Sequence, residues 1–168
     1  MSKDRRDDLI RIVGVEAVVM NDIEDLMDLA ALHCYLENNE LFTLYNIPSE
    51  IAVAIEKMNN PVEDETPAET AGGRESIFDI LLLLAPRLRE LRNIVRKVVI
   101  DSYDVSKGVY SASIHMRVDG ITVQKRVIPS HAIFLSILLN KPAYVTAEVL
   151  EISRRFTPPD DEYSYESE

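Results

Sequence analysis

Cysteine and histidine are scarce in this chain of 168 residues. There is one cysteine, Cys34, and there are three histidines. A single cysteine cannot form an internal disulfide, which fits a reducing compartment. With one thiol and three imidazoles, a structural zinc site built from four Cys or His ligands is not expected.

Long apolar runs are also missing from the sequence. No segment approaches the length of about 18 apolar residues that a membrane span requires. Residues 1–8 form a charged segment that has neither the apolar stretch nor the small-residue cleavage site of an export signal. We therefore expect a cytoplasmic protein without membrane contact, in which residues 9–156 form one domain.

The net charge of −11 is concentrated in two segments. Residues 59–75 carry five acids against Arg74, residues 157–168 carry five acids, and together they hold −9 of the −11 charges. Both are poor in large apolar residues, so burial cannot offset the entropy cost of ordering them. We predict a mobile acidic linker at 59–75 and a disordered, dispensable tail at 157–168. The remaining body is nearly neutral, so the acidic total does not exclude a nucleic-acid partner.

Two stretches of the chain repeat one another at an offset of 81 residues. The sequence 47–49 reads Ile-Pro-Ser and precedes an apolar, helix-prone run, and so does the sequence 128–130. At the same offset, the turn pair Asn38-Asn39 corresponds to Asp119-Gly120, each between two extended-looking runs. A fixed offset indicates one supersecondary unit used twice. We predict that residues 29–59 and 110–140 superpose about an approximate internal twofold.

Apolar periodicity predicts the individual elements. The expected strands are 10–20, 29–36, 41–46, 94–102, 108–118, 121–127 and 142–145, and the expected helices are 50–58, 79–92, 130–139 and 147–156. Pro86 is expected to bend or split the central helix, and Ser76 with Asp79 resembles a capping box. Ser49 and Ser130 are expected to cap the helices that follow them. The predicted fold class is α+β: two related strand-hairpin-helix units form a hairpin-rich mixed sheet with helices packed against it.

The strand at 108–118 alternates cleanly. One face holds Tyr110, Ala112, Ile114, Met116 and Val118, and the other holds Ser111, Ser113, His115 and Arg117. We expect the first face in the core and the second face to be solvated or part of an interface.

The closing third of the chain resembles the bifunctional nuclease family. It reads Pro-Ser-His-Ala-Ile at 129–133, then a helix, then Lys-Pro-Ala-Tyr-Val at 141–145 and Glu-Val-Leu at 148–150. The family typically reads Asp-x-Arg-Pro-Ser-Asp-Ala-Ile, a helix, Pro-Ile-Tyr-Val and Glu-Val-Leu. The resemblance covers roughly residues 9–151 and implies hydrolysis of DNA and RNA that depends on a divalent metal, Mg²⁺ or Mn²⁺.

Three positions depart from the family pattern. Arg126, Ile128 and His131 stand where the family has its first Asp, its Arg and its second Asp. Metal-dependent hydrolysis needs clustered carboxylates to hold hard cations. The resemblance leaves Glu50 and Asp79 as metal ligands. It also makes these two residues and His131, which occupies the slot of Glu50 in the second repeat, the catalytic candidates.

Each candidate also has a purely structural interpretation. Glu50 and Asp79 fall in the first turn of a predicted helix, where an acid interacts favourably with the helix dipole. His131 would be a solvated histidine at a helix start. His33 and His115 would be hydrogen-bonded histidines on strands.

A nucleic-acid contact is suggested by Arg89, Arg92 and Arg96, which are spaced three and four residues apart at the end of the predicted central helix. A helical basic stripe binds phosphates in a salt-sensitive way, although cations are also favourable at a helix C-terminus. No phosphate-binding loop or dinucleotide fingerprint occurs in the chain.

Apolar runs at 80–84 and 134–139 exceed what one small core needs, which favours a homodimer or another small homo-oligomer. Two hypotheses follow. The chain is either a divalent-metal nuclease or a non-catalytic member of the same fold that dimerises or binds a partner.

Overall fold

The computed structural model describes residues 8–20, 29–61 and 74–156. The predicted charged segment 1–8, linker 59–75 and tail 157–168 lie largely or wholly outside the described residues. The strands are β1 (Leu9–Met20), β2 (Leu29–Leu36), β3 (Leu41–Pro48), β4 (Val95–Asp104), β5 (Val109–Val118), β6 (Ile121–Val127) and β7 (Ala143–Thr146). The helices are α1 (Ser49–Asn59), α2 (Ile77–Leu84), the 3-10 turn η2 (Ala85–Arg87), α3 (Arg89–Ile94), α4 (Pro129–Leu139) and α5 (Ala147–Phe156).

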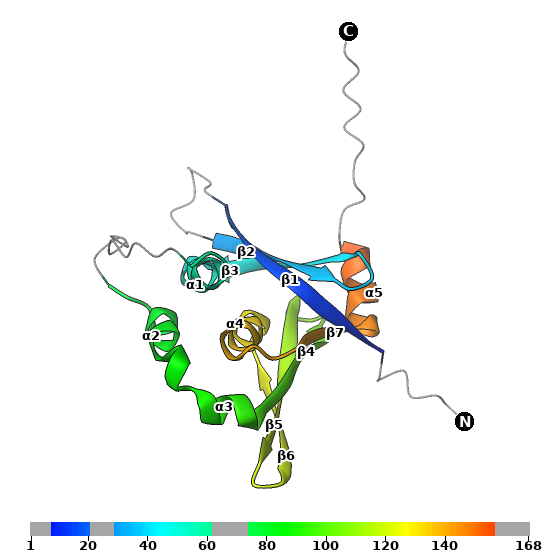
Figure 1. Ribbon diagram of the computed structural model, residues 1–168. Helices are drawn as coiled ribbons and strands as arrows, with labels where there is room; N and C mark the ends of the chain where they lie inside the picture. The colour runs from blue at the N-terminus through cyan, green and yellow to red at the C-terminus, as the bar shows by residue number, and fades with distance from the viewer. Residues whose placement is uncertain (1–7, 21–28, 62–73, 157–168) are drawn as a thin grey trace.

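All described strands belong to one curled, seven-stranded sheet with the order β3-β2-β1-β7-β4-β5-β6 (Figure 1). The short strand β7 joins the two halves, because it pairs antiparallel with β1 and parallel with β4. The remaining pairs are antiparallel. The predicted α+β class with a mixed sheet is confirmed. Both halves contain the order strand, strand, helix, as β2-β3-α1 and β5-β6-α4.

The core lies between the inner face of the sheet and helices α1 and α4. The innermost side chains include Ile51 and Ile55 of α1 and Ile133 of α4, each at most 1% exposed. The sheet contributes Val98, Ile100 and Ala112, which belong to the same apolar cluster. The predicted inward face of β5 is thus confirmed at Ala112. One continuous core therefore spans both halves of the chain.

The central helical segment is divided at Pro86, as the sequence indicated. Helix α2 ends at Leu84, and a 3-10 turn containing Pro86 separates it from α3. The predicted capping box is also confirmed: Ser76 Oγ accepts from the Asp79 backbone N–H, and the Asp79 carboxylate accepts from the Ser76 N–H at 3.0 Å. Within the described residues, no helix is long and apolar enough to cross a membrane.

The predicted caps at the other two helices are wrong. The N-cap of α1 is Pro48 and the N-cap of α4 is Ile128, and neither helix has a side-chain cap hydrogen bond. Each proline fixes φ at a helical value and starts its helix before the serine can occupy the cap position. Ser130 therefore lies inside the first turn of α4. It is 1% exposed, and its Oγ has no hydrogen-bond partner among the described residues.

Ser130→Ala is expected to leave the free energy of unfolding unchanged or raise it by up to about 1 kcal/mol, because it removes a buried hydroxyl that no partner satisfies. Loss of a true N-cap costs about 1 kcal/mol. Ser76→Ala, at the confirmed cap of α2, is the matched control and should show that loss. Thermal and urea unfolding compare the variants. An equal loss in both would mean that Ser130 has a partner after all.

Candidate functional site

The three predicted catalytic residues lie in the first turns of three helices. Glu50 is exposed on α1, Asp79 is half-buried on α2, and His131 is exposed on α4. Strand β3 leads into α1 and ends with Pro48 opposite Leu29, which itself pairs with Met20 of β1. Helix α1 therefore begins at the Met20 end of the sheet.

Helix α4 begins at the other end of the sheet. The register runs from the last residue of β6 across the sheet to β1 through the pairs Val127–Ala112, Ala112–Ile100, Ile100–Val145 and Val145–Ile10. Roughly 30 Å of strand separates Ile10 from Met20, at about 3.3 Å per residue. The register thus starts the helices of Glu50 and His131 at opposite ends of the sheet rather than at one end.

Asp79 holds two helices together. Its Oδ2 accepts from the Ser76 N–H at 3.0 Å and from Ser76 Oγ at 3.1 Å, and its Oδ1 pairs with Lys57 Nζ of α1 at 3.0 Å. Burial alone would raise the pKa of Asp79, but the hydrogen bonds from Lys57 and Ser76 outweigh it and hold the pKa below its usual value. The carboxylate is therefore ionised at neutral pH, and both its oxygens are engaged by the protein.

His131 packs against the start of α2. Its ring centroid lies 5.7 Å from that of Phe78 in an edge-on arrangement, and Phe78 in turn lies 5.0 Å from Phe134. Such edge-to-face pairs stabilise packing between elements. Phe78 therefore anchors α2 on α4 and places His131 beside the helix turn that contains Asp79.

The implied metal finds a limited donor set in the described parts of the chain. No group of three or more His, Cys, Asp or Glu side chains that could hold a metal ion occurs there. Mg²⁺ is often held by one or two carboxylates and several waters. Asp79 has the right chemistry for such a role, but its oxygens would first have to exchange Lys57 and Ser76 for the cation.

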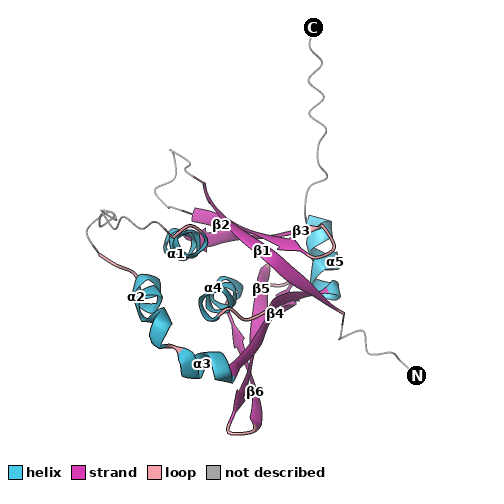
Figure 2. Ribbon diagram, viewed as in Figure 1, coloured by secondary structure: helices cyan, strands magenta, loops and turns pink. Residues whose placement is uncertain are grey.

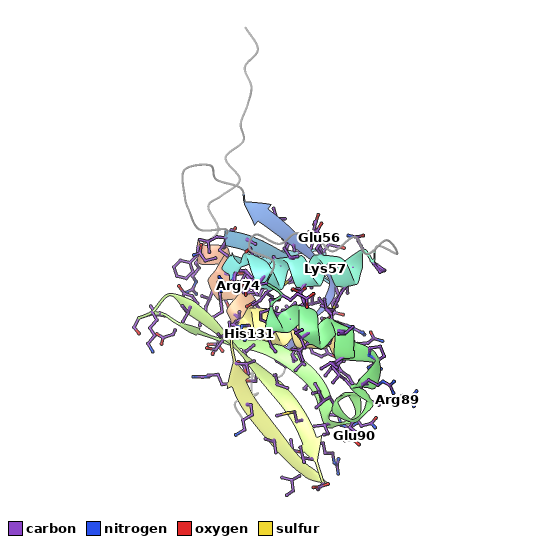
Figure 3. All side chains as sticks on the ribbon, turned by 90° about the vertical axis from the view of Figure 1, so that its left-hand side faces the viewer. Glu56, Lys57, Arg74, Arg89, Glu90 and His131 are labelled. Atoms are coloured by element: carbon purple, nitrogen blue, oxygen red, sulfur yellow. The ribbon has the colours of Figure 1, made fainter. Side chains whose placement is uncertain are left out.

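The predicted stripe of three helical arginines is wrong in its third member. Arg89 and Arg92 lie on α3, but this helix ends at Ile94 and Arg96 is on β4. The β-branched run that begins at Val95 pairs with β5 instead of continuing the helix. Figure 3 shows Arg89 and His131 at opposite ends of the face that it displays. The only depression close to these residues that we describe is lined by Pro86, Arg87 and Arg89.

A polar cluster on the outer face of the sheet was not anticipated. On β4 and β5, Lys97 lies opposite His115 and Val99 lies opposite Ser113. Ser113 Oγ donates to Asp101 Oδ2 at 2.6 Å. The alternation of β5 predicted that Ser113 and His115 share a polar face. The side chains that β4 and β6 add to it depend on strand register, which the sequence does not show.

Helix α2 exposes much of its apolar surface. Each of its residues except Asp79 is apolar, yet none is fully buried. Phe78, Leu81 and Leu82 pack against the core. The exposed side chains, which we call the α2 apolar face, are Ile77 (63%), Ile80, Leu83 (76%) and Leu84, together with Leu91 of α3.

The other predicted interface run, 134–139, is not available for association. Phe134, Leu138 and Leu139 are at most 5% exposed and belong to the protein's own core. Here α4 is surrounded by α1, β4 and β5 rather than by solvent. The surplus of apolar residues is therefore found on α2 alone of the two runs.

Comparison with protein-family models and with curated proteins finds no match to this chain.

Proposed function

We propose that this chain is a bifunctional-nuclease-like domain that has kept the fold, associates with a second copy of itself, and has weak or no hydrolytic activity toward DNA and RNA. The observation that carries the proposal is the bonding of Asp79. Its carboxylate, which survives from the family pattern, joins α1 to α2 through Lys57 and caps α2 through Ser76. The replacement of signature acids by Arg126 and His131 supports the same conclusion.

Duplication of one unit is part of this proposal. The matching order of β2-β3-α1 and β5-β6-α4, with turn residues Asn39 and Asp119 both at positive φ, supports it. Superposition of residues 29–59 on 110–140 remains a prediction, and a difference in strand order or handedness would refute it.

A second copy is the partner that fits the α2 apolar face. The one charged side chain of α2, Asp79, is bonded to Ser76 and Lys57, so the face presents no charge that would select a charged partner. An identical apolar helix related by a twofold axis satisfies such a surface, because each copy buries the same residues. Exposed Arg89 and Glu90 at the start of α3 flank the face with opposite charges, which also suits a twofold arrangement (Figure 3).

Divalent-metal hydrolysis is the second candidate function, and the lowered pKa of Asp79 favours it. An ionised carboxylate is what Mg²⁺ or Mn²⁺ requires, and Asp79 lies one residue from Phe78, which contacts His131. In this alternative, Asp79 and Glu50 would hold the ion, which would supply charge stabilisation at a phosphodiester. The side chain of Lys57 would have to move away first.

Hydrolysis of single-stranded and duplex DNA and RNA is expected at background with Mg²⁺ or Mn²⁺. Purified wild type, Glu50→Ala, Asp79→Ala and Lys57→Met are compared on labelled substrates. Lys57→Met frees the Asp79 carboxylate without removing it, so a metal site at Asp79 would become stronger in this variant. Robust cleavage by the wild type that needs a divalent ion and disappears in both Glu50→Ala and Asp79→Ala would establish the nuclease instead.

A further inference from the structure

The outer face of strands β4, β5 and β6 gathers cationic side chains from separate parts of the chain. Arg126 of β6 lies opposite Ser113, and Gln124 lies opposite His115, which has Lys97 on its other side. These residues therefore share one face of three adjacent strands. The opposite face, with Val98, Ile100 and Ala112, belongs to the core. We call Lys97, His115 and Arg126, with Tyr144 described below, the outer basic face.

The cations of this face are available to a ligand. Within the described ranges, neither Lys97 nor Arg126 forms an ion pair. Figure 2 shows α2, α3 and α4 on the core side of β5 and β6, and no described helix is drawn against their other side. Arg126 is exposed, and it lies close enough to Asp104 to contribute, after the hydrogen bonds of Ser106 and Lys107, to the lowered pKa of that carboxyl.

The centre of the face is already satisfied and firm. Ser113 is 5% exposed and donates to Asp101 at 2.6 Å, so the one carboxylate that directly adjoins His115 on this face is partly occupied. Val99 is buried between Ser113 and Tyr144, its two cross-strand neighbours. Tyr144 is half-buried and therefore keeps part of its ring accessible beside the cations. Arg11 of β1 lies opposite Tyr144 and extends the basic row.

We propose that the outer basic face binds the phosphate backbone of single-stranded nucleic acid, with Lys97 and Arg126 contacting phosphates and Tyr144 offering a stacking surface for a base. Cations combined with an aromatic platform are the usual means of sequence-independent single-strand binding. The cations span three strands instead of converging on one point, which suits successive phosphates of an extended backbone better than one free phosphate ion. The proposal moves the contact away from α3, and it goes beyond the association through α2 because it needs no second copy.

His115 supplies an independent readout. Burial and the neighbouring Lys97 lower the pKa of His115, and Asp101 partly offsets them. Arg117 and Arg126 are the other charged groups of β5 and β6 on this face. The imidazole is therefore neutral at pH 7 and gains its charge only in more acidic solution. Because the added charge is positive, acidification should strengthen phosphate binding.

Fluorescence anisotropy with a labelled oligothymidylate of about 12 nucleotides, a length within the usual site size, tests the proposal on the full chain. Lys97→Ala/Arg126→Ala is expected to raise Kd at least about tenfold and to reduce the salt slope by about one. Arg89→Ala/Arg92→Ala removes the same charge from α3 and should change Kd by less than about twofold. Tyr144→Leu should weaken binding while leaving the salt slope unchanged, and circular dichroism confirms that each variant is folded.

Lowering the pH from 7 to 5 should tighten binding by the wild type about threefold, and His115→Gln should reduce that gain. Inorganic phosphate at equal ionic strength should compete no better than chloride, whereas competition by phosphate would show a site for the free ion. The inference is overturned if the wild type does not bind the oligonucleotide, or if the α3 double variant loses as much affinity as Lys97→Ala/Arg126→Ala. Hydrolysis assays do not enter this test, so its failure is separate from failure of the proposed function.

Discussion

Leu83→Glu is expected to convert a homodimer into a monomer, with a rise of at least about 100-fold in the dimer dissociation constant. Leu83 is 76% exposed in the isolated chain and lies within the α2 apolar face. In the proposed dimer, the new carboxylate would be buried twice across the twofold axis without a partner, at a cost of several kcal/mol. Sedimentation velocity between about 1 and 100 µM, the range in which small interfaces dissociate, measures the change.

The matched control is Val105→Glu. Val105 is 80% exposed in the turn between β4 and β5, so the same chemical change is made away from α2. Both variants should unfold within about 0.5 kcal/mol of the wild type, because each replaces an exposed side chain. A wild type that is monomeric at all concentrations would refute the dimer. A dimer that withstands Leu83→Glu but dissociates with Val105→Glu would place the interface on the β4–β5 turn.

The order of elements could be predicted because local chemistry determines it. Alternating apolar residues, the Asp119-Gly120 turn and the break at Pro86 each act within a few residues of chain. The capping box of Ser76 and Asp79 is equally local. The serines after Pro48 and Pro129 show the limit of such reasoning, because proline and serine compete for the start of a helix, and the proline determines where it begins.

Burial of the two apolar runs could not be predicted from composition. The runs 80–84 and 134–139 are similarly rich in Leu and Ile, yet α4 lies in the core while α2 covers its edge. The difference arises from the sheet order, in which β7 separates the two halves and the sheet curls around α4. That order depends on pairings between residues far apart in sequence, such as Val98 with Ala143.

The candidate site was harder to predict for the same reason. Sequence reasoning found Asp79 and His131 but had no means of placing Lys57 on the carboxylate or Phe78 on the imidazole. It also assigned Arg96 to a helix, because spacings of three and four residues look helical whether or not the helix continues. The outer basic face was half visible, since β5 alternates, but its cations come from β4 and β6 through register.

Ile133→Ala is expected to lower the free energy of unfolding by about 2–5 kcal/mol and the melting temperature by about 4–20 °C, in a single transition. Ile133 is fully buried on α4 within the cluster that includes Ile55 of α1 and Ile100 of β4, so the cavity would lie where both halves meet. Ile121→Ala, at a 66% exposed position in the β5–β6 hairpin, should change stability by less than about 0.5 kcal/mol. Calorimetry together with circular dichroism checks both. Two separate transitions in the variant would show that each strand-hairpin-helix half folds on its own, and the single shared core would then not be what makes unfolding cooperative.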